Sequence, residues 1–142
     1  MHDTPVRPKK KAKLNLRYLL AAFFIVAGLN HFRSPDVYVA MIPPWLPRPY
    51  VLNAVSGVCE VMGGIGVLVP SLRVAAGWGL VALLVAVFPA NLHVALMGRM
   101  PGFSFSPATL WLRLPFQAVL VAWVAWTAIA DDGNGGDGPK PG

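Results

Sequence analysis

The chain has 142 residues, of which 56% are hydrophobic and only 13% carry a charged side chain. This charged fraction is about half that of a typical soluble domain, so too little polar surface remains to cover a water-soluble body. The stretch from Val74 to Gly98 contains no Asp, Glu, Lys or Arg, and it exceeds the roughly 20 residues that span a bilayer. The composition therefore predicts an integral membrane protein and excludes a soluble globular domain.

The formal net charge of +6 is concentrated at one end of the chain and does not form the basic face of a soluble nucleic-acid-binding module. Six of the twelve Lys and Arg residues lie ahead of the first apolar segment or at its start: Arg7, Lys9, Lys10, Lys11, Lys13 and Arg17. Basic residues that flank an apolar helix mark its cytoplasmic side. We therefore interpret residues 1–13 as a basic cytoplasmic segment, and we expect no nucleic-acid partner.

Four apolar segments follow one another, at residues 14–32, 51–70, 72–97 and 108–130. Each is close to the roughly 17 to 25 residues that a spanning helix needs, and none shows the alternation of a barrel strand. We predict an all-α fold, an integral membrane four-helix bundle occupying residues 14–130. The tail at 131–142 is rich in Gly, Pro and Asp, and we expect it to be disordered because it has no apolar anchor.

The connection between the first two apolar segments carries its own start and stop signals. Ser34 followed by Pro35 is typical of a helix start, whereas Pro43 and Pro44 end any helix begun there. We therefore predict a short interfacial helix followed by an extended proline-rich loop that covers the outer face.

The distribution of basic residues also predicts the orientation in the membrane. With both termini on one side, the six residues above are joined there by Arg73 and Lys140, while the other side holds Arg33, Arg48, Arg99 and Arg113. The larger number of Lys and Arg residues faces the cytoplasm. We predict a multi-pass protein of the cell membrane, the plasma membrane, with cytoplasmic N- and C-termini.

Residues 51–70 have one small or polar face and one apolar face. The first carries Asn53, Ser56, Gly57, Glu60, Gly63 and Gly64, and the second carries Val51, Val55, Val58, Met62 and Ile65. Glycines let membrane helices approach closely, so we expect the small face to turn inward.

Glu60 is the candidate catalytic residue on that inward face. At a rise of about 1.5 Å per residue it lies about 13 Å below the outer end of the helix, near the bilayer midplane. An ionised carboxyl there costs at least about 2.5 kcal/mol, so it must be protonated, paired or hydrated. One interpretation is a ligand contact or proton-transfer site, and the alternative is a neutral acid that hydrogen-bonds adjacent helices.

The third and fourth apolar segments contribute further polar residues. Pro89 predicts a kink just before Asn91 and His93, and Arg113 and Gln117 share one helical face. Asn91 can bind a carbonyl ligand and His93 can transfer a proton. The alternative is that Asn91 and His93 satisfy backbone groups freed by the proline.

The predicted topology brings these groups to a common depth. The candidate ligand-binding residues in the outer half of the membrane are His31, Glu60, Asn91, His93, Arg113 and Gln117. Each also has a structural interpretation, such as an arginine that extends to the lipid headgroups. We predict a polar pocket that opens to the outer side, and no metal site, because these residues lack a local ligand spacing.

The motifs between Gly28 and about His93 resemble the DoxX-like family of small bacterial membrane proteins. They are His31-Phe32, Pro35, Tyr38, Met41, Pro43-Pro44-x-Leu46-Pro47, Ser56-Gly57-x-x-Glu60 with Gly63-Gly64, Arg73, and Phe88-Pro89-Ala90-Asn91. The resemblance implies a four-helix membrane bundle. Relatives of that superfamily include a subunit of a thiosulfate:quinone oxidoreductase, and others are linked to thiol or oxidative-stress systems.

Two functions from different classes follow as hypotheses, and neither requires that the chain itself be an enzyme. The first is an accessory subunit of a membrane redox system that binds a quinone or similar amphiphile in the outer pocket. The alternative is a non-enzymatic membrane adaptor or assembly factor, with the basic N-terminus and the proline-rich loop as contact surfaces. The expected partners are the lipid bilayer and a membrane or membrane-associated redox protein, and a homo-oligomer remains an open alternative.

Overall fold

The structure is a computed structural model that describes residues 8–130. Within that range it contains only helices: α1 (Pro8–Arg33), α2 (Pro35–Val39), α3 (Pro49–Gly66), α4 (Arg73–Met97), α5 (Pro107–Val124) and the π-helix η1 (Ala125–Ile129). The prediction of an all-α fold is confirmed for these residues. The expectations for the start of the basic segment and for the tail at 131–142 lie outside the described residues.

Several helices begin or end away from the positions expected from hydropathy. α1 starts at Pro8, within the segment expected to precede the membrane domain, because its lysines and alanine are good helix formers. α3 ends at Gly66 rather than at residue 70, because Pro70 has no N–H to donate to the carbonyl of Gly66 and its ring crowds that carbonyl. The last apolar segment does not stay α-helical to its end, since it continues from Val124 into η1.

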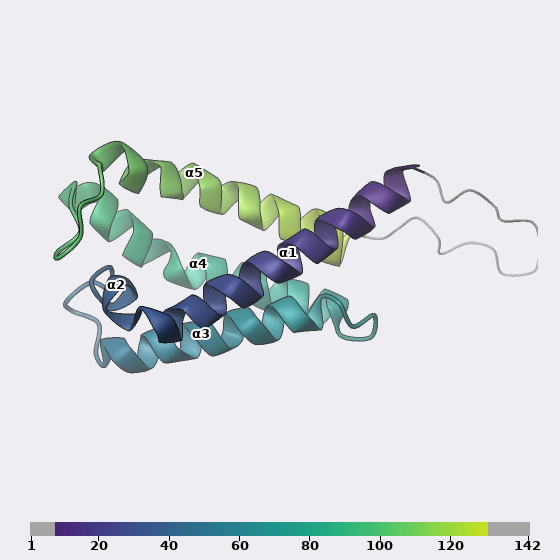
Figure 1. Cartoon of the computed structure of the whole chain (residues 1–142), viewed down its shortest axis with the longest axis horizontal. Coiled ribbons are helices and arrows are strands. Elements are labelled where there is room, and N and C mark those ends of the chain that lie inside the picture. Colours follow the sequence, from purple (N-terminus) through teal and green to yellow (C-terminus); the bar gives the residue numbers. More distant parts are fainter. Residues whose placement is uncertain (1–7, 131–142) are drawn as a thin grey trace, which may run out of the picture.

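The helices run back and forth between two ends of the molecule (Figure 1). The start of α1, the α3–α4 connection and the end of η1 lie at one end, and α2 and the α4–α5 connection lie at the other. We name the first the basic end, because it carries Lys9, Lys10, Lys11, Lys13, Arg17 and Arg73. α1 packs along α3, and α4 packs against both α3 and α5. This arrangement places polar residues from α1 and α3 along one shared seam.

Among residues 8–130, three helices are long and apolar enough to cross a membrane: Pro8–Arg33, Arg73–Met97 and Pro107–Ile129. They indicate a membrane protein and are consistent with contact with a lipid bilayer. α3 is not one of the three, because Tyr50, Asn53 and Glu60 lower its mean hydropathy.

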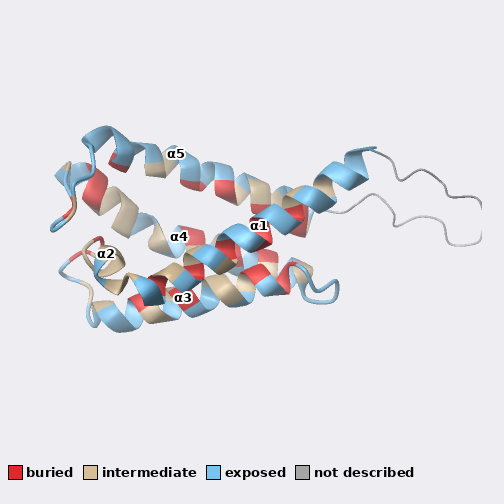
Figure 2. Ribbon diagram, viewed as in Figure 1, coloured by how far each residue is buried: buried red, intermediate tan, exposed pale blue. Residues whose placement is uncertain are grey.

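Burial follows the small-inside, large-outside pattern expected for α3. Its buried residues include Asn53, Gly57 and Gly64. Its exposed apolar side chains are Val51, Val55, Val58, Met62 and Ile65. Figure 2 shows the same pattern across the molecule, with buried residues on the facing sides of the helices and exposed ones outside. The predicted sidedness of this helix is confirmed.

The connection between α1 and α3 forms the short helix that Ser34 and Pro35 predict. Met41 follows it and is buried with Val94, Met100 and Leu110 in a cluster at the end opposite the basic end. The turn after α2 is therefore held against α4 and α5 by Met41, while Trp45 further along the loop is 72% exposed.

Candidate functional site

The site is built on a close approach between α1 and α3. A Cβ atom on Gly57 would lie 2.8 Å from the Cβ of His31 and 2.9 Å from the carbonyl oxygen of Gly28. A Cβ on Gly28 would lie 2.7 Å from the carbonyl oxygen of Gly57. Only glycine at both positions permits these separations, because the two backbones meet where side chains would otherwise stand.

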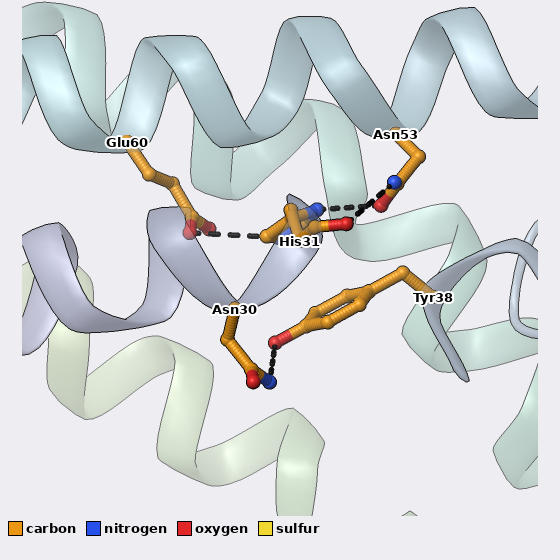
Figure 3. A network of polar contacts seen from close by, with 5 residues as sticks. All are labelled: Asn30, His31, Tyr38, Asn53 and Glu60. Atoms are coloured by element: carbon orange, nitrogen blue, oxygen red, sulfur yellow. Dashed lines mark hydrogen bonds and ion pairs between the residues drawn. The ribbon is translucent and has the colours of Figure 1, made fainter. Parts of the chain in front are cut away.

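His31 lies at this crossing, between two polar residues of α3 (Figure 3). Its Nδ1 is 2.7 Å from Oδ1 of Asn53, and Nδ2 of Asn53 donates to the carbonyl oxygen of His31 at 3.0 Å. On the other side, its Nε2 is 3.5 Å from Oε2 of Glu60. Asn53 and Glu60 are two helical turns apart and share one face. The imidazole of α1 therefore bridges them.

Asn53 fixes which ring nitrogen of His31 carries a proton. The amide nitrogen of Asn53 is engaged by the carbonyl of His31, so its Oδ1 faces Nδ1 and accepts from it. In a neutral imidazole the other nitrogen, Nε2, is then an acceptor and faces Glu60. An attractive contact between Nε2 and the carboxyl requires one proton between them, on either group. A pair that holds one such proton has zero net charge.

The carboxyl of Glu60 is only partly satisfied by this contact. Its Oε2 is buried and has no hydrogen-bond partner among residues 8–130, since the 3.5 Å separation from His31 is longer than a hydrogen bond normally allows. The side chain of Glu60 is 13% exposed, and that of His31 is 9% exposed. Glu60 is therefore the slightly more exposed member of the pair, although its unpartnered Oε2 lies inside the contact between the helices.

Helix α2 covers the imidazole from the remaining side. The rings of His31 and Tyr38 are stacked, with centroids 3.8 Å apart and planes inclined by 23°. Nδ2 of Asn30 donates to the hydroxyl oxygen of Tyr38 at 2.8 Å, which holds the phenol in place (Figure 3). The short helix thus closes the site and fixes the orientation of the histidine.

Asn91 and Gln117 form a separate polar contact between α4 and α5. Nδ2 of Asn91 donates to Oε1 of Gln117 at 2.9 Å, and Nε2 of Gln117 donates to the carbonyl oxygen of Leu84. That carbonyl is adjacent to the carbonyl of Val85, which loses its helical donor because Pro89 has no N–H. Asn91 therefore bonds a side chain of α5, and neither Asn91 nor His93 bonds the carbonyl of Val85, so this contact does not decide between the ligand-binding and structural interpretations.

Arg113 and His93 lie apart from both groups. Nη1 of Arg113 is 3.1 Å from the sulfur of Met41, and its guanidinium stands 5.4 Å from the ring centroid of Phe105. His93 is half-buried and makes no hydrogen bond or ion pair within the described part of the chain.

The structure therefore brings together His31 with Glu60, and separately Asn91 with Gln117, rather than all six predicted residues. Sequence reasoning did not include Asn53, Tyr38 and Asn30 among the site residues. The spacing of Asn53 and Glu60 on one face is a signal that could have identified Asn53. No group of three or more His, Cys, Asp or Glu side chains suited to a metal ion occurs in residues 8–130.

Comparison with known proteins gives a family but no characterised relative. No curated protein and no solved structure matches the chain. The model of one protein family, described as a domain of unknown function (DUF8561), matches residues 20–128. This span includes α2, α3, α4 and α5, the second half of α1 and most of η1. The chain belongs to the DUF8561 family.

Proposed function

We propose that the chain is an accessory subunit of a membrane redox system, in which the His31–Glu60 pair exchanges a proton with a quinone or similar amphiphile. The observation that carries this proposal is the contact of 3.5 Å between Nε2 of His31 and Oε2 of Glu60. This contact lies between two helices that expose apolar side chains to their surroundings.

The proposal includes a four-helix membrane bundle in which α3 also crosses the membrane, from Val51 onward. Its support is the exposed apolar face of α3 and the packing of α3 between α1 and α4. The basic end then faces the cytoplasm, because it holds most of the Lys and Arg residues of the described chain. Both termini are cytoplasmic in this topology.

A proton shared by an imidazole and a carboxyl suits proton exchange inside a membrane. An isolated ionised carboxyl is costly in an apolar surrounding. With His31 beside it, Glu60 can hold the shared proton or pass it to Nε2 of His31 while the pair stays neutral. Donation of that proton to a ligand leaves the pair with one negative charge until a proton from outside replaces it. Asn53 keeps Nε2 directed at the carboxyl, as a proton-transfer group requires.

The partial exposure of Glu60 and the unpartnered state of its Oε2 favour a ligand oxygen as the missing hydrogen-bond partner. A quinone has such oxygens and takes up protons when it is reduced, with electrons supplied by a partner redox protein. The resemblance to DoxX-like proteins directs the proposal to this ligand class.

Binding of a short-chain benzoquinone to the full chain in mild detergent tests the proposal. We expect Glu60→Gln to weaken binding of the reduced hydroquinone form by about tenfold or more, because its O–H donates to the carboxylate and a hydrogen bond to a charged group contributes about 1.5 to 3 kcal/mol. Asp36→Asn is the matched control, since it makes the same acid-to-amide change at an exposed residue. Equal binding by the wild type, Glu60→Gln and Asp36→Asn would contradict the proposal.

A membrane adaptor is the second candidate, and one exposed residue favours it. Trp45 in the proline-rich loop is 72% exposed, and exposed tryptophans are frequent anchors of protein interfaces. In an adaptor, Trp45→Ser would abolish co-purification of a stoichiometric partner, and Glu60→Gln would leave it intact. If Trp45→Ser left co-purification of the partner intact and Glu60→Gln abolished it, an adaptor that uses this loop would be excluded.

A further inference from the structure

A shallow apolar groove lies far from the His31–Glu60 pair, near the basic end. It has a volume of about 380 Å³ and is lined by Leu16, Val119, Ala122, Trp123 and Trp126. Leu16 comes from α1, and the other four form a stripe with helical spacing along α5 and η1. At a rise of about 1.5 Å per residue, Leu16 is about 22 Å from His31 along α1. The groove is therefore a separate feature of the molecule.

Hydrogen bonds that join α1 to the end of α5 and to η1 hold the walls of this groove in place. Nε1 of Trp123 donates to the carbonyl oxygen of Leu16 at 3.1 Å. Nε of the buried Arg17 donates to the carbonyl oxygen of Thr127 at 2.7 Å, and Nζ of Lys13 donates to that of Ala130 at 3.0 Å. These bonds hold α1 against the end of η1, so the groove is formed in the absence of an occupant.

The entrance of the groove at the basic end is positively charged. Lys9 and Lys13 precede Leu16 by two turns and one turn, so they lie on the same side of α1. Lys9 is exposed, and the bond from Lys13 to Ala130 holds a second ammonium group beside the end of η1. Trp126 is 45% exposed, and its indole N–H has no hydrogen-bond acceptor within residues 8–130.

We propose that this groove binds an acyl chain of an anionic phospholipid, with the phosphate held by Lys9 and a lipid oxygen accepting from the indole of Trp126. The apolar lining fits a hydrocarbon chain, and tryptophan places its ring in apolar surroundings and its N–H at the headgroup level. The basic side chains select the negative headgroup, since each contributes about 1 kcal/mol near an anionic surface. A soluble anion lacks the chain that the groove accommodates, and a zwitterionic lipid lacks the net charge.

Quenching of tryptophan fluorescence by lipids with brominated chains tests this site directly. The reporter protein is the full chain with Trp45, Trp78 and Trp111 changed to Phe, which leaves only Trp123 and Trp126. A reference protein keeps Trp78 alone, because Trp78 is also exposed near the start of α4. Each is placed in phosphatidylcholine bilayers that contain a minor fraction of brominated phosphatidylglycerol or of brominated phosphatidylcholine.

We expect the reporter, but not the reference, to be quenched more strongly by the anionic lipid than by the zwitterionic one at equal mole fraction. Lys9→Gln should reduce the apparent affinity for the anionic lipid by about fivefold. Lys11→Gln is the matched control, because Lys11 lies about 140° around the helix from Leu16. Ala122→Leu, which fills the groove, should reduce quenching by the anionic lipid even with both lysines present.

Two results would overturn the proposal. Equal quenching of the reporter by the two lipids would show that the groove holds no anionic lipid in preference to its surroundings. Equal losses in Lys9→Gln and Lys11→Gln would show a diffuse attraction of the basic segment for the membrane surface, without a defined site.

Discussion

The α1–α3 seam and the α4–α5 seam both bury polar side chains between apolar helices, but their chemistry differs. At the first, two glycines bring the backbones together, and an imidazole contacts a carboxyl. At the second, the neutral amides of Asn91 and Gln117 bond each other and a carbonyl near Pro89. The first seam therefore holds a group that can gain or lose a proton, and the second does not.

This difference shows why polar residues in apolar helices need a structural context before they are assigned a role. Asn91 and Gln117 have an internal use, because they bond each other and the carbonyl of Leu84 across the contact between α4 and α5. Glu60 has no such use, since its Oε2 keeps no hydrogen-bond partner in the described part of the molecule. Four substitutions test the contrast, from the largest expected effect to the smallest.

Gly57→Ala should have the largest effect on stability. The new Cβ would meet the Cβ of His31 and the backbone of Gly28, so the helices must separate, at a cost of about 2 to 3 kcal/mol in the free energy of unfolding. Unfolding in mixed micelles by added denaturing detergent measures it. Gly79→Ala is the control, because nothing lies within 4 Å of its added Cβ, and that change should be neutral or stabilising. Equal destabilisation by both would argue against a close α1–α3 contact.

His31→Phe should cost about 2 kcal/mol, because it keeps a ring against Tyr38 but leaves Asn53 and Glu60 without a partner. Combined with Glu60→Gln, its effect should be smaller than the sum of the two single changes, since the residues are in contact. The same unfolding assay measures the four proteins of this double-mutant cycle: the wild type, His31→Phe, Glu60→Gln and the double variant. Additive effects would mean that the 3.5 Å contact contributes nothing to stability.

Gln117→Leu should cost about 1 to 2 kcal/mol, because it removes the bonds to Asn91 and to the carbonyl of Leu84. Amides do not titrate, so the cost should be the same at every pH in the range where the protein is folded. It should also leave benzoquinone binding unchanged, in contrast to Glu60→Gln. A loss of binding equal to that of Glu60→Gln would place both seams in one ligand site.

Tyr50→Phe should have the smallest effect, because its bond to Asp36 is exposed. The hydrogen bond with Asp36, together with the negative charge of that residue, raises the pKa of Tyr50 above its ordinary value of 10.0. The folded state therefore keeps the phenol proton to higher pH than the unfolded state. This contribution to stability is present below pH 10 and is lost as the pH rises through the folded-state pKa. The wild type should therefore be slightly more stable than Tyr50→Phe by a constant amount at neutral pH, and the two stability profiles should converge above pH 10. A difference between the two proteins that stays constant through pH 10 would contradict this assignment.

Much of the fold follows from patterns along single helices. The apolar segments predicted all-α architecture, the Ser34-Pro35 and Pro43-Pro44 pairs predicted the short α2, and the small face of α3 predicted its buried side. The ends of α1 and α3 were less predictable. For α1, hydropathy does not show that the basic segment ahead of the apolar residues is a good helix former. For α3, the proline that follows the helix has no N–H for the carbonyl four residues before it, so the helix ends before the apolar segment does.

The candidate site was predictable residue by residue but not as a group. Composition and spacing selected His31, Glu60, Asn91 and Gln117, because polar side chains are rare in such segments. A shared depth suggested one pocket, but depth gives no information on the rotation of each helix about its own axis. Interhelical packing sets those rotations, and it pairs His31 with Glu60 and Asn91 with Gln117.

The sequence by itself predicted a helical chain with four apolar segments, of which three form helices long and apolar enough to cross a membrane within residues 8–130, and it identified Glu60 as the acid placed within an apolar segment. These properties depend on local composition and period. Only the tertiary structure decided which group faces Glu60, through the approach of Gly28 to Gly57, and which nitrogen of His31 faces the carboxyl, through Asn53. The physical reason is that a proton shared between two side chains depends on atomic distances and orientations, which no single helix contains.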